Sequence, residues 1–175
     1  MGEDQSKDEL LFTEEDELFW VDLSKSKTGK YVFLIAASSE TYETHLLNLD
    51  DGKDAKLKLF QARKFGLRYD VTHHGSGVFL VNTNLGGAKN HKLMICNESS
   101  ESNTGTSAFP ISSWRELVPY QKMRQILDVE EFKDYLAIEG REDGLTQIWI
   151  ADLRNKNLAS PDATPLELSR LLCFC

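Results

Sequence analysis

The sequence predicts an all-β fold: a partial β-propeller with about two complete four-stranded antiparallel blades and three strands of another. The first observation is the block 30–50, where two apolar runs flank a polar turn at 38–41, as in paired strands on a buried surface. The second is that this block recurs at 77–97 and 134–152, because such repeats are typical of propellers and arrays. The third is that the apolar runs are short and bounded by turns, which does not suit helices.

The first predicted blade covers approximately 17–63 and consists of four strands joined by short polar connections. Gly29 can adopt positive φ and is expected in the turn between the first two strands. A further short strand candidate lies upstream at 8–15. The four strands of the blade are expected at 17–23, 31–35, 44–49 and 57–60.

The second predicted blade, approximately 67–121, repeats this order. Its first strand alternates apolar and polar residues, as a half-buried strand should. The polar tract 97–107 lengthens the third connection and is interpreted as a loop insertion. The strands are expected at 67–72, 78–81, 92–96 and 114–118.

The third predicted blade, approximately 125–153, has strands at 125–129, 135–138 and 146–151 but no recognisable fourth strand. The following residues are polar, contain two prolines and do not resemble 57–60. Residues 1–153 are therefore predicted to form the partial propeller, and 154–175 an unmatched C-terminal tail. A single β-sandwich also needs many short strands, but the unit-by-unit match of the second and third strands favours the propeller.

Composition excludes several classes of protein. The 175 residues suffice for one domain or a piece of a larger one. The net charge of −8 and pI near 5.0 argue against nucleic acid as a partner, since its recognition needs a clustered basic surface. No apolar run is long enough for a bilayer, and the polar N-terminus is no signal peptide. We therefore expect no nucleic-acid partner and no membrane association.

The three cysteines indicate a reducing compartment. Cys96 falls in a predicted strand and is expected to be a small buried residue. Cys173 and Cys175 have no second pair to complete a zinc site. An odd count without a disulfide framework predicts a cytoplasmic protein.

One short motif imitates a catalytic nucleophile. Serine hydrolases place the serine in a Gly-x-Ser-x-Gly elbow, which this sequence lacks. Gly75-Ser76-Gly77 is the nearest match, but His74 and Val78 stand where the outer glycines should be, so we expect a hairpin turn. His73 and His74 are adjacent on a strand and point to opposite faces. They are interpreted as turn or surface histidines, not as a base or a metal site.

Other polar clusters also lack the spacing that chemistry needs. The acidic group at 14–16 does not match a calcium loop, and both this group and the one at 128–131 are expected to be solvated. Residues 141–144 predict a β-turn with Gly144 at positive φ. The sequon at 97–99 matters only in a secreted protein. We therefore expect no catalytic, metal-binding or cofactor-binding residue in this chain, and no cofactor.

Several motifs together resemble a known family over approximately 8–155. The most specific are Gly-Ala-Lys-Asn at 87–90 and Arg-x-x-Gly-Leu-Thr at 141–146, supported by Trp-Arg-Glu-Leu-Val-Pro at 114–119. With these motifs the chain resembles the propeller domain of the prolyl oligopeptidase family of serine peptidases, most closely its oligopeptidase B members. His91 departs from the family pattern, which more often has an aromatic residue there in a strand.

The resemblance implies a function in proteolysis. Family members have a seven-bladed propeller that caps an α/β-hydrolase domain and restricts the enzyme to short peptides. This chain would supply part of the propeller, with the catalytic domain as its partner and short peptides as substrates of the parent enzyme. Since the chain contains no catalytic domain, it is expected to be inactive alone. Whether the parent cleaves after Arg and Lys or after Pro is not determined by these residues.

The alternative is a free-standing β-repeat module that binds proteins and derives from a peptidase. An open stack of blades leaves terminal faces uncovered, so the chain alone is expected to aggregate or to be partly unfolded. Both ends are expected to be artificial relative to the fold of the family.

Overall fold

The computed structural model describes residues 4, 6, 8–103 and 106–171 and arranges them in three antiparallel sheets. Each sheet has four strands in chain order, and we call the sheets the first, second and third blades. The first comprises β1 (Trp20–Lys25), β2 (Tyr31–Ala37), β3 (Tyr42–Asn48) and β4 (Lys58–Gln61). The second comprises β5 (Tyr69–His74), β6 (Val78–Thr83), β7 (Lys92–Asn97) and β8 (Arg115–Val118). The third comprises β9 (Arg124–Glu131), β10 (Tyr135–Glu142), β11 (Leu145–Asp152) and β12 (Ser169–Arg170).

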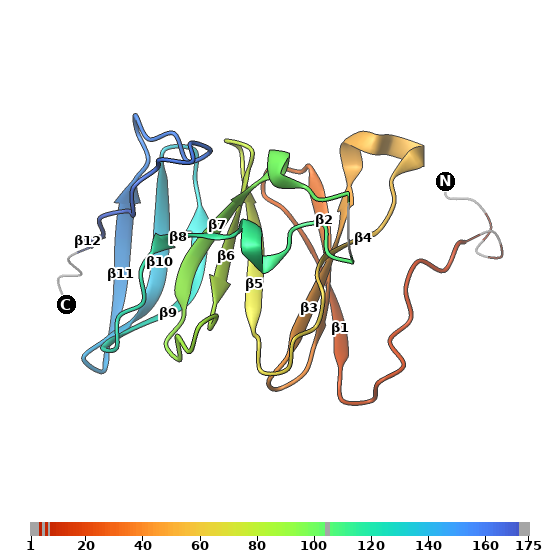
Figure 1. Cartoon of the computed structure of the whole chain (residues 1–175), viewed down its shortest axis with the longest axis horizontal. Coiled ribbons are helices and arrows are strands. Elements are labelled where there is room, and N and C mark those ends of the chain that lie inside the picture. Colours follow the sequence, from red (N-terminus) through yellow and green to blue (C-terminus); the bar gives the residue numbers. More distant parts are fainter. Residues whose placement is uncertain (1–3, 5, 7, 104–105, 172–175) are drawn as a thin grey trace.

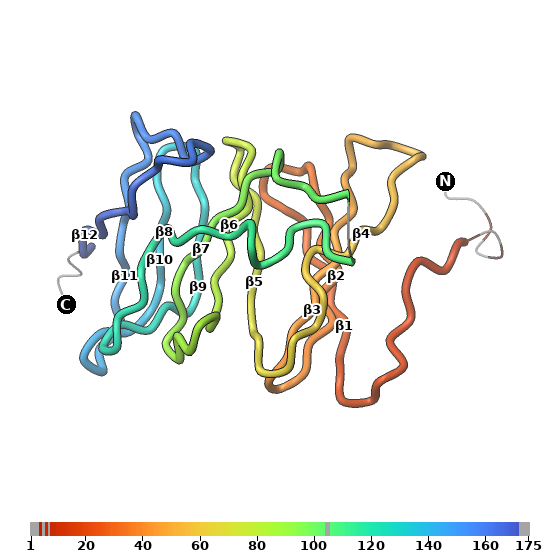
Figure 2. Tube along the Cα trace, viewed as in Figure 1, coloured from red at the N-terminus to blue at the C-terminus, as the bar shows by residue number. Residues whose placement is uncertain are grey.

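The three blades stand side by side in the order of the sequence (Figure 1). The Cα trace runs up and down within each blade before it passes to the next (Figure 2). The second blade is therefore covered on both faces, whereas the first and third lie at opposite ends of the stack. This arrangement confirms the predicted all-β partial propeller. The helical segments among the described residues are short 3-10 turns, at Leu49–Asp54, Glu98–Ser100 and Ile111–Ser113 in the chain after residue 8.

An aromatic interface joins the first and second blades. Phe79, on β6, lies at its centre and is fully buried. Its ring centroid is 4.8 Å from that of Phe109, 5.1 Å from that of Tyr31 and 5.3 Å from that of Phe60. Tilted and edge-to-face pairs at these separations add to the hydrophobic stabilisation. We call this cluster, with Phe33, Tyr69, Met94, Cys96 and Trp114, the aromatic interface.

An aliphatic interface joins the second and third blades. Leu80, the neighbour of Phe79 on β6, points to this side, because successive side chains of a strand alternate between faces. Leu80, Ile95 and Leu136 are almost fully buried, and Trp149 supplies the large aromatic side chain. We call this cluster the aliphatic interface; it also includes Val78, Leu93, Leu117, Ile126, Ile138, Leu158 and Leu166.

Long connections cover the outer edges of the sheets. In the connection between β7 and β8, the amides of Ala108 and Phe109 donate to the carbonyls of Leu59 and Phe60, at 2.7 and 2.8 Å. These two residues directly follow the predicted loop insertion at 97–107 and supply hydrogen bonds to β4. Between β11 and β12 the amide of Leu166 donates to Leu117 O of β8, at 2.8 Å. Covering an edge strand in this way removes unpaired groups that could bind another chain.

The structure corrects three details of the sequence prediction. Residues 8–15 contain no strand. The third blade has a fourth strand, because β12 pairs with Trp149 and Ile150 of β11; its two residues are too short to show a pattern. His91 precedes β7 and has a φ of 62°, so it is not a strand residue.

The predicted division at 153/154 remains a prediction about domains. The segment after 153 is nevertheless packed against the blades: Leu158 and Leu166 are buried in the aliphatic interface. Asn97 Nδ2 also donates to Ala159 O at 2.8 Å.

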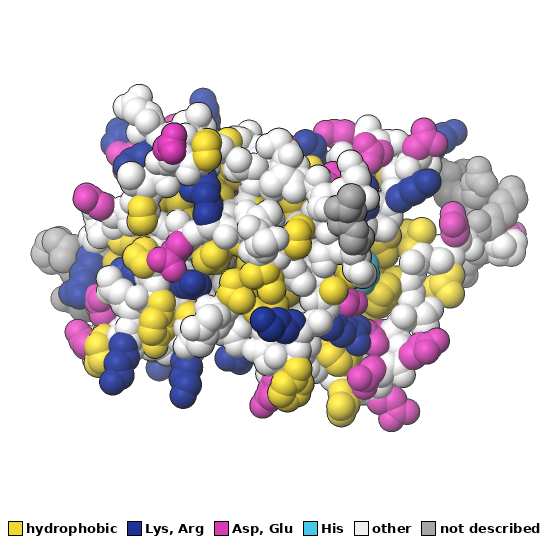
Figure 3. All heavy atoms as spheres, in the orientation of Figure 1, with side chains coloured by type: hydrophobic (Ala, Val, Ile, Leu, Met, Phe, Trp, Pro, Cys, Tyr) yellow, Lys and Arg dark blue, Asp and Glu magenta, His cyan; other side chains and the backbone are white. Residues whose placement is uncertain are grey.

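The surface carries charged side chains of both signs, with hydrophobic side chains exposed between them in the view of Figure 3. Among the large apolar residues that remain exposed, Trp20, Val21 and Leu23 lie on β1. None of the helices in the described residues has the length and apolar character needed to span a membrane.

Candidate functional site

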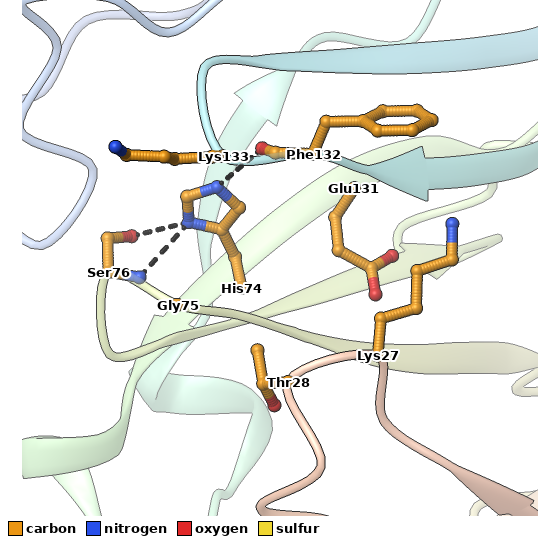
Figure 4. A pocket seen from close by; sticks show the side chains of 8 residues that line it. All are labelled: Lys27, Thr28, His74, Gly75, Ser76, Glu131, Phe132 and Lys133. Atoms are coloured by element: carbon orange, nitrogen blue, oxygen red, sulfur yellow. Dashed lines mark hydrogen bonds between the residues drawn. The ribbon is translucent and has the colours of Figure 1, made fainter.

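A cavity with a buried carboxylate lies where one hairpin of each blade converges. The hairpins connect β1 to β2, β5 to β6 and β9 to β10, and each joins the first two strands of its blade. We call this space, of about 450 Å³, the three-hairpin cavity. Its lining residues, shown in Figure 4, are Lys27, Thr28, His74, Gly75, Ser76, Glu131, Phe132 and Lys133.

His74 and Ser76 form a hydrogen-bonded pair in this cavity. His74 Nδ1 lies 2.8 Å from Ser76 Oγ and 3.2 Å from the Ser76 amide, and His74 Nε2 lies 2.9 Å from the carbonyl oxygen of Phe132 (Figure 4). A carbonyl only accepts, so Nε2 carries the proton and Nδ1 is the acceptor. The imidazole thereby links the second hairpin to the third.

This pair is not arranged as a catalytic dyad. In a serine hydrolase, an acid orients the histidine from the nitrogen opposite the serine. Here a backbone carbonyl takes that place, and Ser76 lies in a hairpin turn closed by the hydrogen bond from Gly77 N to His74 O, at 3.1 Å. The geometry supports the predicted turn, in which His74 and Ser76 are hydrogen-bonded to each other.

Glu131 places a carboxylate in the same cavity. It is the last residue of β9 and faces the second blade, with 7% of its surface exposed. Its Oε1 is buried, with no hydrogen-bond partner among the described residues. Burial of a carboxylate oxygen without a partner is costly, so this group is an exception that needs a physical explanation.

Two lysines flank the carboxylate without neutralising it. Lys27 pairs with Glu130, and its Nζ lies 4.9 Å from the ring centroid of Phe132. Lys133 forms no hydrogen bond or ion pair within the ranges that the structure describes, and its side chain points away from Glu131 (Figure 4). The cavity thus combines one unpaired buried carboxylate with two ammonium groups and an aromatic ring.

A second polar cluster lies next to the cavity, at the end of the aromatic interface. Glu98 Oε1 accepts hydrogen bonds from Lys30 Nζ and Tyr31 Oη, both at 2.7 Å. His73 Nε2 lies 2.9 Å from the same oxygen, but the contact is not aligned as a hydrogen bond. His73 Nδ1 lies 2.7 Å from Thr28 Oγ1. This cluster connects the first hairpin to the end of β7.

The charges of this cluster follow from burial and from its hydrogen bonds. Burial lowers the pKa of His73, and the approach of Glu98 only partly offsets this. Burial acts to raise the pKa of Glu98, but hydrogen bonds from Lys30 and Tyr31 outweigh it, so that pKa lies below its usual value. The pKa of Tyr31 is raised, by burial and by its hydrogen bond to Glu98. Glu98 therefore stays ionised at neutral pH, beside a neutral phenol and imidazole.

The sequence prediction was correct on some of these positions and wrong on others. His73 and His74 do point to opposite faces, but both are buried strand residues, not turn or surface residues. Glu131 was expected to be solvated with its acidic neighbours and is buried instead. Glu131 is two residues from the apolar Val129 and therefore lies on the same face of β9, and this spacing was the available signal for its burial.

Several further predictions concern other parts of the chain. Gly29 and Gly144 have the expected positive φ, 75° and 83°, and Cys96 is buried. Glu14 is not simply solvated, since it pairs with Arg63. No group of three or more metal-ligating side chains occurs in the described parts of the chain. Cys173 and Cys175 lie outside the described residues.

Comparison with known proteins identifies the family. The sequence model described as "Prolyl oligopeptidase, N-terminal beta-propeller domain" matches residues 1–170. The chain belongs to the prolyl oligopeptidase family. Within it, the chain is 34% identical to Protease 2 of Moraxella lacunata over 150 residues, which are 86% of this chain and 20% of that protein. It is 28% identical to the prolyl endopeptidase-like protein of Gallus gallus, over 72% of this chain and 16% of that protein.

Solved structures of the family agree with this assignment. Oligopeptidase B from Trypanosoma brucei, in a closed form with covalently bound antipain, superposes with a TM-score of 0.79 at 32% identity. The match covers 99% of this chain and 23% of that one. Oligopeptidase B from Leishmania major gives a TM-score of 0.75 at 33% identity, over 87% of this chain and 20% of that one.

The chain therefore corresponds to part of the N-terminal propeller of prolyl oligopeptidases. It spans about a fifth of the length of these relatives. In this family the propeller is a domain separate from the catalytic one, which agrees with the absence of a Gly-x-Ser-x-Gly elbow from this sequence.

Proposed function

We propose that this chain is the substrate-gating part of a serine-type oligopeptidase that acts on short peptides together with an α/β-hydrolase domain. The match of residues 1–170 to the N-terminal propeller domain carries the proposal. The three blades support it, because they form a compact stack without an elbow serine of their own. The likeness to oligopeptidase B structures, at 32 and 33% identity, favours this function over that of a free-standing binding module.

The proposal extends to partners and location. The catalytic domain is the first partner, and short peptides are the substrates of the complete enzyme, with no role for nucleic acid or membrane. We also propose a cytoplasmic location, because the three cysteines form no disulfide framework in the sequence pattern. By itself, the chain should not hydrolyse peptides.

Labelling of the active-site serine in the native protein tests this function. An antibody against the exposed turn at 141–146 would capture the native product from its own cells after treatment with a fluorophosphonate probe. We expect one labelled polypeptide, of mass above 19.9 kDa, that cleaves a short peptide and spares a folded protein with the same cleavage site. Captured protein that carries no labelled serine and has no peptidase activity would overturn the proposal.

A further inference from the structure

The unpaired carboxylate of Glu131 is the feature of the three-hairpin cavity that the fold does not explain. More than nine-tenths of this residue is buried, and Oε1 has no partner among the described residues. Its neighbour Glu130, by contrast, lies on the opposite face and pairs with Lys27. Since a buried charge is normally paired or hydrogen-bonded, the position of Glu131 indicates a site for a donor from outside the chain.

The surrounding groups define the chemistry of that donor. A bare metal ion is disfavoured, because the described residues offer no group of three metal-ligating side chains and two lysines line the same cavity. A ligand that fits must bring a cationic donor to Glu131 and oxygen acceptors to Lys27 and Lys133. It must also fit in about 450 Å³ beside the ring of Phe132.

We propose that the three-hairpin cavity binds the free N-terminus of a short peptide, with Glu131 as the counter-ion of its α-ammonium group. The ammonium group supplies donors for the buried carboxylate, and such charge-assisted bonds are the stronger kind. The peptide carbonyls and carboxylate then face the ammonium groups of Lys27 and Lys133. The choice of a peptide rests on the proposed function, whereas the need for a cationic donor rests on Glu131 alone.

Titration of the intact native protein with trialanine tests this inference. Its active-site serine is first blocked with a fluorophosphonate, so that binding is measured without cleavage. We expect trialanine with a free N-terminus to bind about tenfold or more tightly than N-acetyl-trialanine, the effect of one charge-assisted hydrogen bond. Glu131→Gln should reduce the affinity for the free peptide by a similar factor and leave the acetylated peptide unaffected.

A matched control and a second variant complete the test. Glu139→Gln removes an exposed carboxylate of the same blade that does not line the cavity, and should leave the affinity unchanged. Lys133→Gln should weaken trialanine more than its C-terminal amide. Equal binding of the free and acetylated peptides, or full affinity in Glu131→Gln with an unchanged melting temperature, would overturn the inference. If no serine is labelled, the proposed function fails, but titration of the unblocked protein still decides the inference.

Discussion

The aromatic interface and the aliphatic interface hold the second blade from opposite sides by different means. Phe79 and Leu80 are consecutive residues of β6, yet Phe79 packs among the rings of the first blade and Leu80 among the aliphatic chains of the third. The aromatic interface also ends in the charged cluster around Glu98, whereas the three-hairpin cavity beside the aliphatic interface contains the unpaired Glu131. The carboxylate of Glu98 is therefore paired within the chain, whereas Oε1 of Glu131 has no partner among the described residues.

The stability of the stack comes partly from contacts within each blade and partly from contacts between neighbouring blades. Each blade has its own backbone hydrogen bonds, but its apolar faces are buried only against its neighbours, as in other repeat proteins. Ring pairs add directional preferences to burial, while aliphatic chains contribute mainly by burial and close packing. Substitutions can therefore weaken one interface and leave the other intact.

The largest expected effect on the free energy of unfolding comes from truncating, one at a time, the two central side chains of β6. Phe79→Ala should lower the free energy of unfolding by about 3–5 kcal/mol, because it removes contacts to Tyr31, Phe60 and Phe109 and leaves a cavity. Leu80→Ala should lower it by about 2–4 kcal/mol. Chemical denaturation of the intact protein measures both. A larger loss for Leu80→Ala would contradict the importance assigned to the ring cluster.

The aliphatic interface can be disturbed alone by adding one methyl group. A Cβ at Gly140 would lie 1.9 Å from Gln125 O and 2.8 Å from the Trp149 ring, where β9 and β10 shift register. Gly140→Ala should therefore displace β9 and cost about 2–3 kcal/mol. Gly75→Ala is the control, since its added Cβ meets no atom within 4 Å. Thermal unfolding of both variants measures the difference in stability between them. Equal melting temperatures would show that the sheet can shift to accommodate the added methyl group.

The charged end of the aromatic interface gives a smaller effect. Glu98→Gln replaces the carboxylate that accepts from Lys30 and Tyr31 and should cost about 1–2 kcal/mol. Glu101→Gln, which removes an exposed pair with Lys58, should cost less than about 1 kcal/mol. The two variants have the same chemical change and are compared by denaturant unfolding. Equal costs would show that the Glu98 cluster adds nothing to the interface.

The pH dependence of stability reports on His73, at the charged end of the aromatic interface. Burial lowers the pKa of His73, so the folded protein binds fewer protons than the unfolded chain below pH 6.5. Stability from this group is present above pH 6.5 and is lost as the pH falls toward the folded pKa, by at most about 1.4 kcal/mol per pH unit. The charged or titratable groups that influence the pKa of His73 are Glu98, Lys30 and His74.

His73→Asn provides the measurement for that dependence. Because the pKa values of His45 and His91 are also lowered by burial, the variant should lose part of the slope between pH 7 and pH 5 and retain the rest. Melting temperatures at several pH values in this range would show it. An unchanged slope would mean that His73 does not titrate differently in the folded and unfolded states.

Local sequence patterns were sufficient for most of the strands. Alternation along β5, apolar runs such as that of β2 and glycine at positions of positive φ depend on neighbours in the chain, and these predictions were confirmed. The repeat predicted the stacking of blades for the same reason, since each copy carries the same pattern. A two-residue strand such as β12 has no such pattern and was missed.

Local sequence patterns could not predict the candidate site. The sequence by itself determined most of the chain's strands, its repeat and its family resemblance, because these follow from residue order and short-range periodicity. Only the tertiary structure brought Lys27, His74 and Glu131 from three blades into one cavity and left one carboxylate unpaired. It also placed the connections that cover β4 and β8. The physical reason is that burial and pairing of a charge depend on residues tens of positions away, which no local pattern specifies.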